Sequence, residues 1–243
     1  MKQPIRGMSL GLLITLAIFG YTNQLPAAEA DSFEVSSIKA VRPTLVDTIA
    51  AIQQRDIARA KTAFDAYDSG WNGIEMYINV RSKQLYEEIE LNLQAKIIKE
   101  LDAPSPDFNL LLADANAMLA KYDETIAMIA KAPPLNSLFD DIARLRIVRA
   151  HLREVVPALK ARNLAKAQKS FEAFDDAWFE IEDFFRSRSV DAYVAVEKGE
   201  VQLEQAFMLE KPDVAELTAL VNGVMTQYNA VVAELQREAR RHQ

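Results

Sequence analysis

Four glutamates, with the aromatic and basic residues around them, have the types and spacing that could support chemistry. Each glutamate follows a tryptophan or a tyrosine by four residues, which places the two side chains on one face of a helix. Carboxylate and phenolate oxygens are ligands that hard cations such as ferric iron or calcium prefer. The predicted metal ligands are Glu75, Glu90, Glu182 and Glu197, and the predicted supporting residues are Trp71, Arg81, Tyr86, Trp178, Arg188 and Tyr193.

The same residues also have a purely structural interpretation. A carboxylate that faces a core is costly unless it is paired. The arginine near the end of the same helix could supply that pair, and the following tyrosine could donate a hydrogen bond. In this alternative the Glu–Arg–Tyr clusters only fix the pairing of helices, in a metal-free scaffold that docks a membrane or periplasmic protein. A metal site would instead leave unneutralised carboxylates around a cavity open to water.

The sequence lacks the residues of most common active sites. It contains no cysteine, and its histidines are His151 and His242. It has no His-Glu-x-x-His motif, no Gly-x-Ser-x-Gly elbow and no glycine loop that could cradle a phosphate. We therefore predict that the protein is not an enzyme. An acid–base pair formed by Glu75 and Glu90 is the enzymatic alternative.

The chemically interesting residues belong to a segment that occurs twice. Residues 56–90 align with residues 163–197 at an offset of 107 without a gap, and 12 of the 35 pairs are identical. Further along, the segment from Pro106 to Tyr122 matches the segment from Pro212 to Tyr228 at an offset of 106. This pattern indicates an internal duplication.

The elements that carry these residues are predicted to be helices. Apolar residues recur every three to four positions, and glycine is rare, with 7 residues in the chain. We predict an all-α, internally duplicated fold of two antiparallel four-helix units packed as one eight-helix body, with two separate bundles as the alternative. The units span 31–131 and 137–240, joined at Ala132-Pro133-Pro134. In the first unit the later helices begin near Asp56, Ser82 and Asp107, and in the second they span 163–186, 189–210 and 213–240.

Residues 1–30 have the features of a secretory signal peptide. A basic start precedes an uncharged, mostly apolar run from Met8 to Tyr21, and Ala28-Glu29-Ala30 is a small-x-small cleavage site. An uncleaved N-terminal anchor is the alternative. The net charge of −7 argues against binding to nucleic acid or to anionic membranes. We expect a soluble protein, not itself membrane-spanning after cleavage, in the periplasm or another extracytoplasmic compartment.

The repeated pattern Trp-x-x-Ile-Glu…Arg-Ser-x-x-x-Tyr-x-x-Ile/Val-Glu resembles the N-terminal extracytoplasmic helical domain of bacterial Ftr-type iron permeases. More distantly, it is similar to imelysin-like periplasmic proteins of iron uptake. The resemblance covers about 35 residues of each copy. It implies a binding or accessory protein for uptake or sensing of iron or another hard cation, with a membrane iron transporter or another periplasmic protein as partner. The imelysin-like His-x-x-Glu motif is changed here to Asn72-x-x-Glu75 and Phe179-x-x-Glu182.

Overall fold

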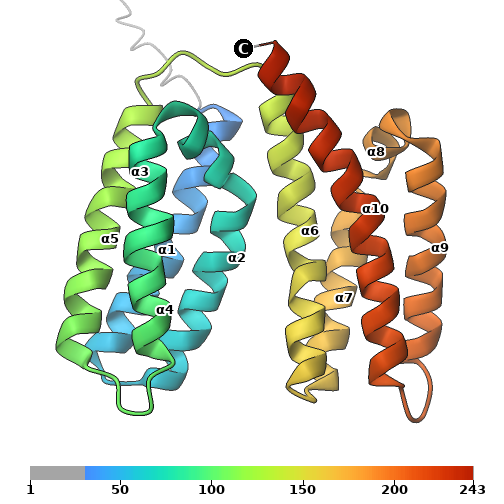
Figure 1. Cartoon of the computed structure of the whole chain (residues 1–243), viewed down its shortest axis with the longest axis horizontal. Helices are drawn as coiled ribbons and strands as arrows, with labels where there is room; N and C mark the ends of the chain where they lie inside the picture. Colours follow the sequence, from blue (N-terminus) through green and yellow to red (C-terminus); the bar gives the residue numbers. More distant parts are fainter. Residues whose placement is uncertain (1–30, 243) are drawn as a thin grey trace, which may run out of the picture. The chain divides into compact units, whose positions relative to one another are not determined.

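The computed structural model describes residues 31–242, and within this range every regular element is helical (Figure 1). The predicted all-α fold is confirmed, whereas the predicted signal peptide lies outside the described residues. The first bundle contains α1 (Phe33–Gln53), α2 (Ile57–Arg81), α3 (Lys83–Glu87), the π-helical segment η1 (Glu88–Gln94), α4 (Ala95–Leu101) and α5 (Phe108–Ile129). The second bundle contains α6 (Leu138–Lys160), α7 (Leu164–Trp178), α8 (Glu182–Arg188), α9 (Val190–Phe207) and α10 (Val214–Arg241).

Short polar side chains determine where most helices begin. Each of these residues lies just before a helix and accepts a hydrogen bond from a backbone N–H of the first turn, which would otherwise lack a partner. The capping residues of this kind are Ser32, Asp56, Ser82, Asp107, Asn163, Ser189 and Asp213. The starts predicted near Asp56, Ser82 and Asp107 are therefore confirmed.

The two bundles have the same aromatic core. Trp71 stacks on Tyr67 and Tyr86 in the first bundle, and Trp178 stacks on Phe174 and Tyr193 at the matching positions of the second. In each bundle a hydrogen bond from a tyrosine hydroxyl also joins the last helix to the first. The hydroxyl of Tyr122 donates to the carbonyl of Ile38, and that of Tyr228 donates to the carbonyl of Leu145, both at 2.8 Å. These paired contacts allow residue-by-residue comparison of the bundles.

Two elements differ from their predicted form. The helix predicted over 163–186 is interrupted, because α7 ends at Trp178 and α8 begins at Glu182. Two acidic residues, Glu182 and Asp183, lie in the first turn of α8, where carboxylates stabilise a helix N-terminus. The third helix of the first unit is also irregular, since η1 interrupts it and includes Glu90. Segments of π-helix are frequent at functional sites.

The bundles meet where α2 packs against α6, within one compact unit, Asp31–Gln243. Gly73 makes this contact close, because a Cβ atom added to it would lie 2.7 Å from Cγ1 of Ile147. Polar side chains also join the two helices. The joining pairs are Ser69–Glu154, Tyr77–Asp140 and Glu75–Arg146. Within residues 31–242, no helix has the length and apolar character needed to cross a membrane.

Candidate functional site

The second glutamate of each predicted cluster is held by the buried tryptophan of its own bundle. The indole Nε1–H of Trp71 donates to Glu90, and the indole Nε1–H of Trp178 donates to Glu197 at 2.7 Å. Both indole N–H groups therefore have the acceptor that a buried tryptophan needs. These contacts bring together two predicted residues in each bundle.

The first glutamate of each cluster has a different partner in each bundle. Glu75 forms an ion pair with Arg146, which belongs to α6 of the other bundle. Glu182 accepts a long hydrogen bond from the hydroxyl of Tyr193, at 3.4 Å. Tyr193 and its counterpart Tyr86 both stack on the tryptophan of their own bundle. The two copies of the motif are thus not equivalent in their electrostatics.

The predicted pairing of these glutamates with the arginine of the same motif is wrong. Arg81 instead forms two hydrogen bonds with Glu34, at 2.6 and 2.7 Å, and the side chains are only 9% and 6% exposed. Since α1 and α2 are antiparallel neighbours, the end of α2 lies beside the start of α1, and Arg81 reaches across to it. Arg188 lies 3.4 Å from Glu238 near the end of α10.

In the part of the chain that the structure describes, the predicted metal ligands are not gathered into a metal-binding group. Within residues 31–242, no three or more histidine or carboxylate side chains converge in a way that could hold a metal ion. Burial, followed by the nearby Glu75 carboxylate, raises the pKa of Glu90 and also that of Tyr86. The first bundle therefore brings two carboxylates and a phenol near one another, but Glu75 and Glu90 already have the partners described above.

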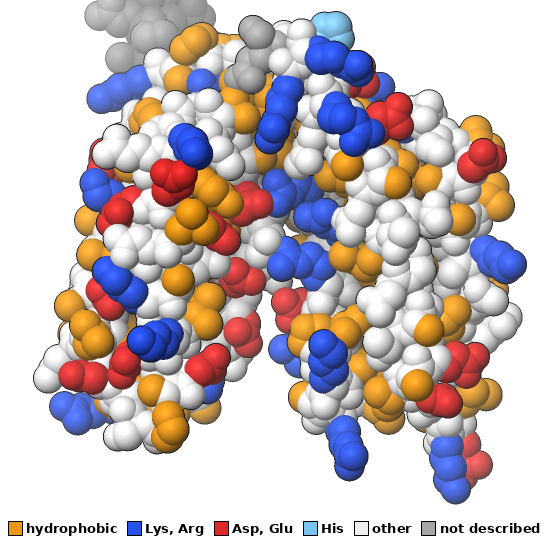
Figure 2. All heavy atoms as spheres, viewed as in Figure 1, with side chains coloured by type: hydrophobic (Ala, Val, Ile, Leu, Met, Phe, Trp, Pro, Cys, Tyr) orange, Lys and Arg blue, Asp and Glu red, His pale blue; other side chains and the backbone are white. Residues whose placement is uncertain are grey.

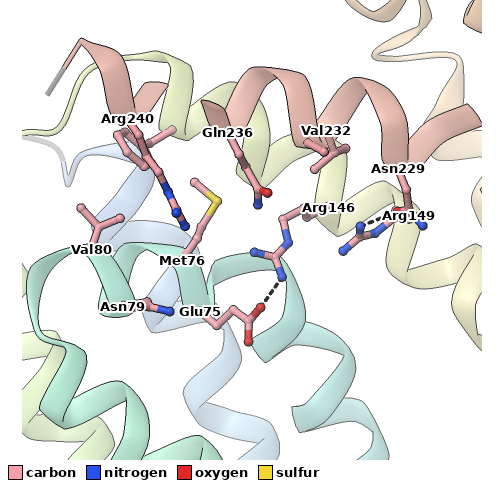
Figure 3. Close-up of a pocket in the computed structure, with 12 residues that line it drawn as sticks. Glu75, Met76, Asn79, Val80, Arg146, Arg149, Asn229, Val232, Gln236 and Arg240 are labelled. Atoms are coloured by element: carbon pink, nitrogen blue, oxygen red, sulfur yellow. Dashed lines mark hydrogen bonds and ion pairs between the residues drawn. The ribbon is translucent and has the colours of Figure 1, made fainter. Parts of the chain in front are cut away.

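A pocket of about 430 Å³ lies where α2, α6 and α10 meet, beside the Glu75–Arg146 ion pair (Figure 3). Its wall combines three arginines, one carboxylate, three amide side chains and several apolar groups. The lining residues are Glu75, Met76, Asn79, Val80, Phe139, Arg146, Arg149, Asn229, Val232, Ala233, Gln236 and Arg240. Only Glu75 belongs to the set of residues predicted from the sequence.

The arginines of this pocket carry more charge than their neighbours neutralise. Arg146 is 7% exposed and pairs with Glu75. Arg149 is half-buried, and its Nη1 donates to the amide oxygen of Asn229 at 2.6 Å. The Nε groups of Arg146 and Arg149 are buried, and neither has a hydrogen-bond acceptor among the described residues. Burial, followed by the charges of Arg146 and Arg153, lowers the pKa of Arg149 to about 10.

The first bundle shows how such an arginine is otherwise neutralised. Arg42 is the counterpart of Arg149 on the first helix, and Asp123 is the counterpart of Asn229 on the last helix. Arg42 forms two hydrogen bonds with Asp123, at 2.6 and 2.9 Å. This contact raises the pKa of Arg42 and lowers the pKa of Asp123. In the second bundle a neutral amide replaces the carboxylate, and the guanidinium lines a pocket.

The sequence places these basic groups on one face of α6. Arg146, Arg149 and Arg153 are spaced by three and four residues, so they follow one another along the helix. Acidic residues of the first bundle lie opposite. Burial raises the pKa of one of them, Asp68, and the charge of Arg153 offsets part of this increase. Figure 2 shows basic side chains gathered along the boundary between the bundles, facing acidic side chains of the first.

This arrangement is suited to binding an anion. Arginine presents five N–H donors in a planar fork that matches carboxylate and phosphate oxygens, and Asn79 and Gln236 add neutral donors in the same pocket. The site was not predicted from the sequence, because its residues come from three separated helices. The detectable signal was the change from Asp123 to Asn229 between the two copies.

Comparisons of the chain with protein-family models, with curated proteins and with solved structures each give no match. The resemblance to the helical domain of iron permeases therefore stays a prediction.

Proposed function

We propose that this protein is a non-enzymatic binding protein that takes a small organic anion into the pocket between α2, α6 and α10. The observation that carries the proposal is the contact of Arg149 with Asn229, where the first bundle pairs Arg42 with Asp123. A bound anion would provide the negative charge that Asn229 lacks. The pocket volume of about 430 Å³ lies in the range of small-molecule sites.

The energetics favour an anion over other ligands. The lowered pKa of Arg149 means that the fold disfavours its charged form. An anion next to the guanidinium would reverse this effect, so part of the cost of burying Arg149 would be recovered on binding. Charge-assisted hydrogen bonds to buried guanidinium groups are stronger than neutral ones.

The test is a calorimetric titration of the protein with succinate, citrate and inorganic phosphate at low ionic strength. We expect saturable binding that is lost in Asn229→Asp, because the new carboxylate would occupy Arg149. The matched control is Asp123→Asn, which removes the equivalent carboxylate from the first bundle and should leave the affinity unchanged. Absence of binding to the unmodified protein, or undiminished binding to Asn229→Asp, would overturn the proposal.

Binding of iron or another hard cation is the second candidate function, favoured by the proximity of Glu75 and Glu90. A cation there would have to displace Arg146 and Trp71 from these carboxylates. Titration with ferric citrate, ferrous iron and calcium, beside a Glu75→Gln/Glu182→Gln double variant, tests this candidate. Saturable binding that the double variant loses would support it, and a variant that is only less stable would favour the metal-free scaffold.

The composition of residues 1–30 supports an extracytoplasmic location for either function. In that compartment a membrane transporter or another periplasmic protein would be the partner. Export is tested by fractionating cells that express the full chain and determining the N-terminus of the product. A new N-terminus at Asp31 in the extracytoplasmic fraction is expected, and an intact chain retained in the cytoplasm would contradict it.

A further inference from the structure

The basic groups of the pocket are divided between two ends. Figure 3 shows Arg240 at one end and Arg149 at the other, with Arg146 between them. Arg240 and Asn229, the partner of Arg149, are eleven residues apart on α10. At the rise of an α-helix, this is roughly 16 Å between their backbones.

The two ends also differ in their exposure to water. Arg146 is buried and Arg149 half-buried, whereas Arg240 is exposed on the last turn of α10. The first two guanidinium groups therefore form an inner cationic end, and Arg240 forms an outer one. No carboxylate among the described residues lies within ion-pair distance of Arg149 or Arg240.

Apart from Arg149, Arg240 and the Glu75–Arg146 pair, the wall of the pocket carries no charge. The uncharged part of the wall consists of apolar side chains and the amides of Asn79, Asn229 and Gln236. The apolar groups are Met76, Val80, Phe139, Val232 and Ala233. Such a wall accommodates an uncharged chain and would disfavour a further charge at this position.

We infer that the ligand is an elongated dianion with two terminal acidic groups joined by an uncharged spacer. This inference rests on the proposed function. One acidic group would bind Arg146 and Arg149, and the other would bind Arg240. Linked groups that engage two sites gain affinity without new contacts, provided that the spacer spans the distance. Both α,ω-dicarboxylates and α,ω-bisphosphonates meet this description.

The inference predicts a dependence of affinity on spacer length. Calorimetric titration would compare oxalate, succinate, adipate and suberate with butyrate and hexanoate, and would include bisphosphonates of matching lengths. We expect affinity to pass through a maximum as the spacer lengthens, at values above those of the monocarboxylates. If either the dicarboxylates or the bisphosphonates bind more tightly, the acidic group of that series is the preferred terminal group of the ligand.

The matched variants are Arg240→Gln and Arg241→Gln, which remove the same charge from neighbouring positions, of which only Arg240 lines the pocket. Arg240→Gln should weaken binding of the best dianion by up to about fivefold, the range of an exposed ion pair, and should weaken monocarboxylate binding by a smaller factor. Arg241→Gln should change neither. Monocarboxylates that bind as tightly as dianions, or equal effects of both variants, would overturn the inference alone. Absence of binding by every anion would overturn the proposed function as well.

Discussion

Arg149 and Asn229 occupy the positions that Arg42 and Asp123 occupy in the first bundle, but only Arg42 and Asp123 form an ion pair. The two pairs join the same helices of their bundles, α1 with α5 and α6 with α10. The hydrogen bond to Asp123 raises the pKa of Arg42, whereas burial, followed by the charges of Arg146 and Arg153, lowers the pKa of Arg149. Binding sites commonly retain groups that cost stability, because those groups serve the ligand.

Replacing Arg149 should therefore stabilise the protein while abolishing binding. The variant Arg149→Met keeps the aliphatic volume and removes the half-buried charge. We expect the free energy of unfolding to rise by about 1 kcal/mol, in the range found when buried charges are replaced by apolar groups. Chemical denaturation in urea measures the change. A variant that is less stable than the original protein would show that Arg149 has a structural role.

The buried ion pair of Arg81 with Glu34 should be structural and should not affect the pocket. Glu34→Gln leaves an uncompensated guanidinium in a buried site. The free energy of unfolding, measured by denaturation in urea, should therefore fall by about 3 kcal/mol. Anion affinity should be unchanged under conditions where the variant remains folded. A loss below about 1 kcal/mol would mean that water solvates the charge of Arg81 after the substitution.

The contact of α2 with α6 should depend on Gly73. A leucine at this position cannot fit against Ile147, so Gly73→Leu should separate the helices, lower the melting temperature and weaken anion binding. Gly223→Ala is the matched control, because nothing lies within 4 Å of the added Cβ atom. The control should raise the free energy of unfolding by up to about 1 kcal/mol through helix propensity. If both variants bind the anion with equal affinity, anion binding does not depend on the contact between α2 and α6.

Glu200 should make the stability of the protein fall as the pH rises. Burial and the adjacent Asp175 raise its pKa to about 9. Between the ordinary pKa of glutamate and this value, the folded state binds a proton that the unfolded state has released, so stability declines with pH. Glu200→Gln removes this dependence. Its melting temperature should exceed that of the original protein more at pH 8 than at pH 5, and a constant difference would contradict the raised pKa.

Local signals account for the part of the fold that the sequence predicted. The caps at Asp56, Ser82 and Asp107, together with the helical period, are properties of short segments, and the structure confirms those helix starts. The interruption after Trp178 was missed because the apolar spacing continues through it. The periodicity of apolar residues alone does not reveal an interruption of three residues between two helices.

The candidate site was beyond sequence reasoning for a different reason. Glu75 was identified as chemically relevant, but its partner Arg146 lies 71 residues away in the other bundle. The pairing with Arg81 was predicted from proximity along the helix, whereas the actual partner depends on how α2 packs against α6. Arg240, a further lining residue, comes from the last turn of the chain's final helix. Packing between distant helices determines the site, and no local pattern encodes it.

The central claim, that an anion binds beside Arg149, is tested most directly by nuclear magnetic resonance of the arginine Nε–Hε groups. Succinate would be titrated into the labelled protein, with the signals of Arg149, Arg146 and Arg42 assigned by substitution. We predict saturable shifts for Arg149 and Arg146, with Arg42 unchanged because Asp123 already occupies it. Equal shifts for all three arginines, or none for Arg149, would contradict the claim.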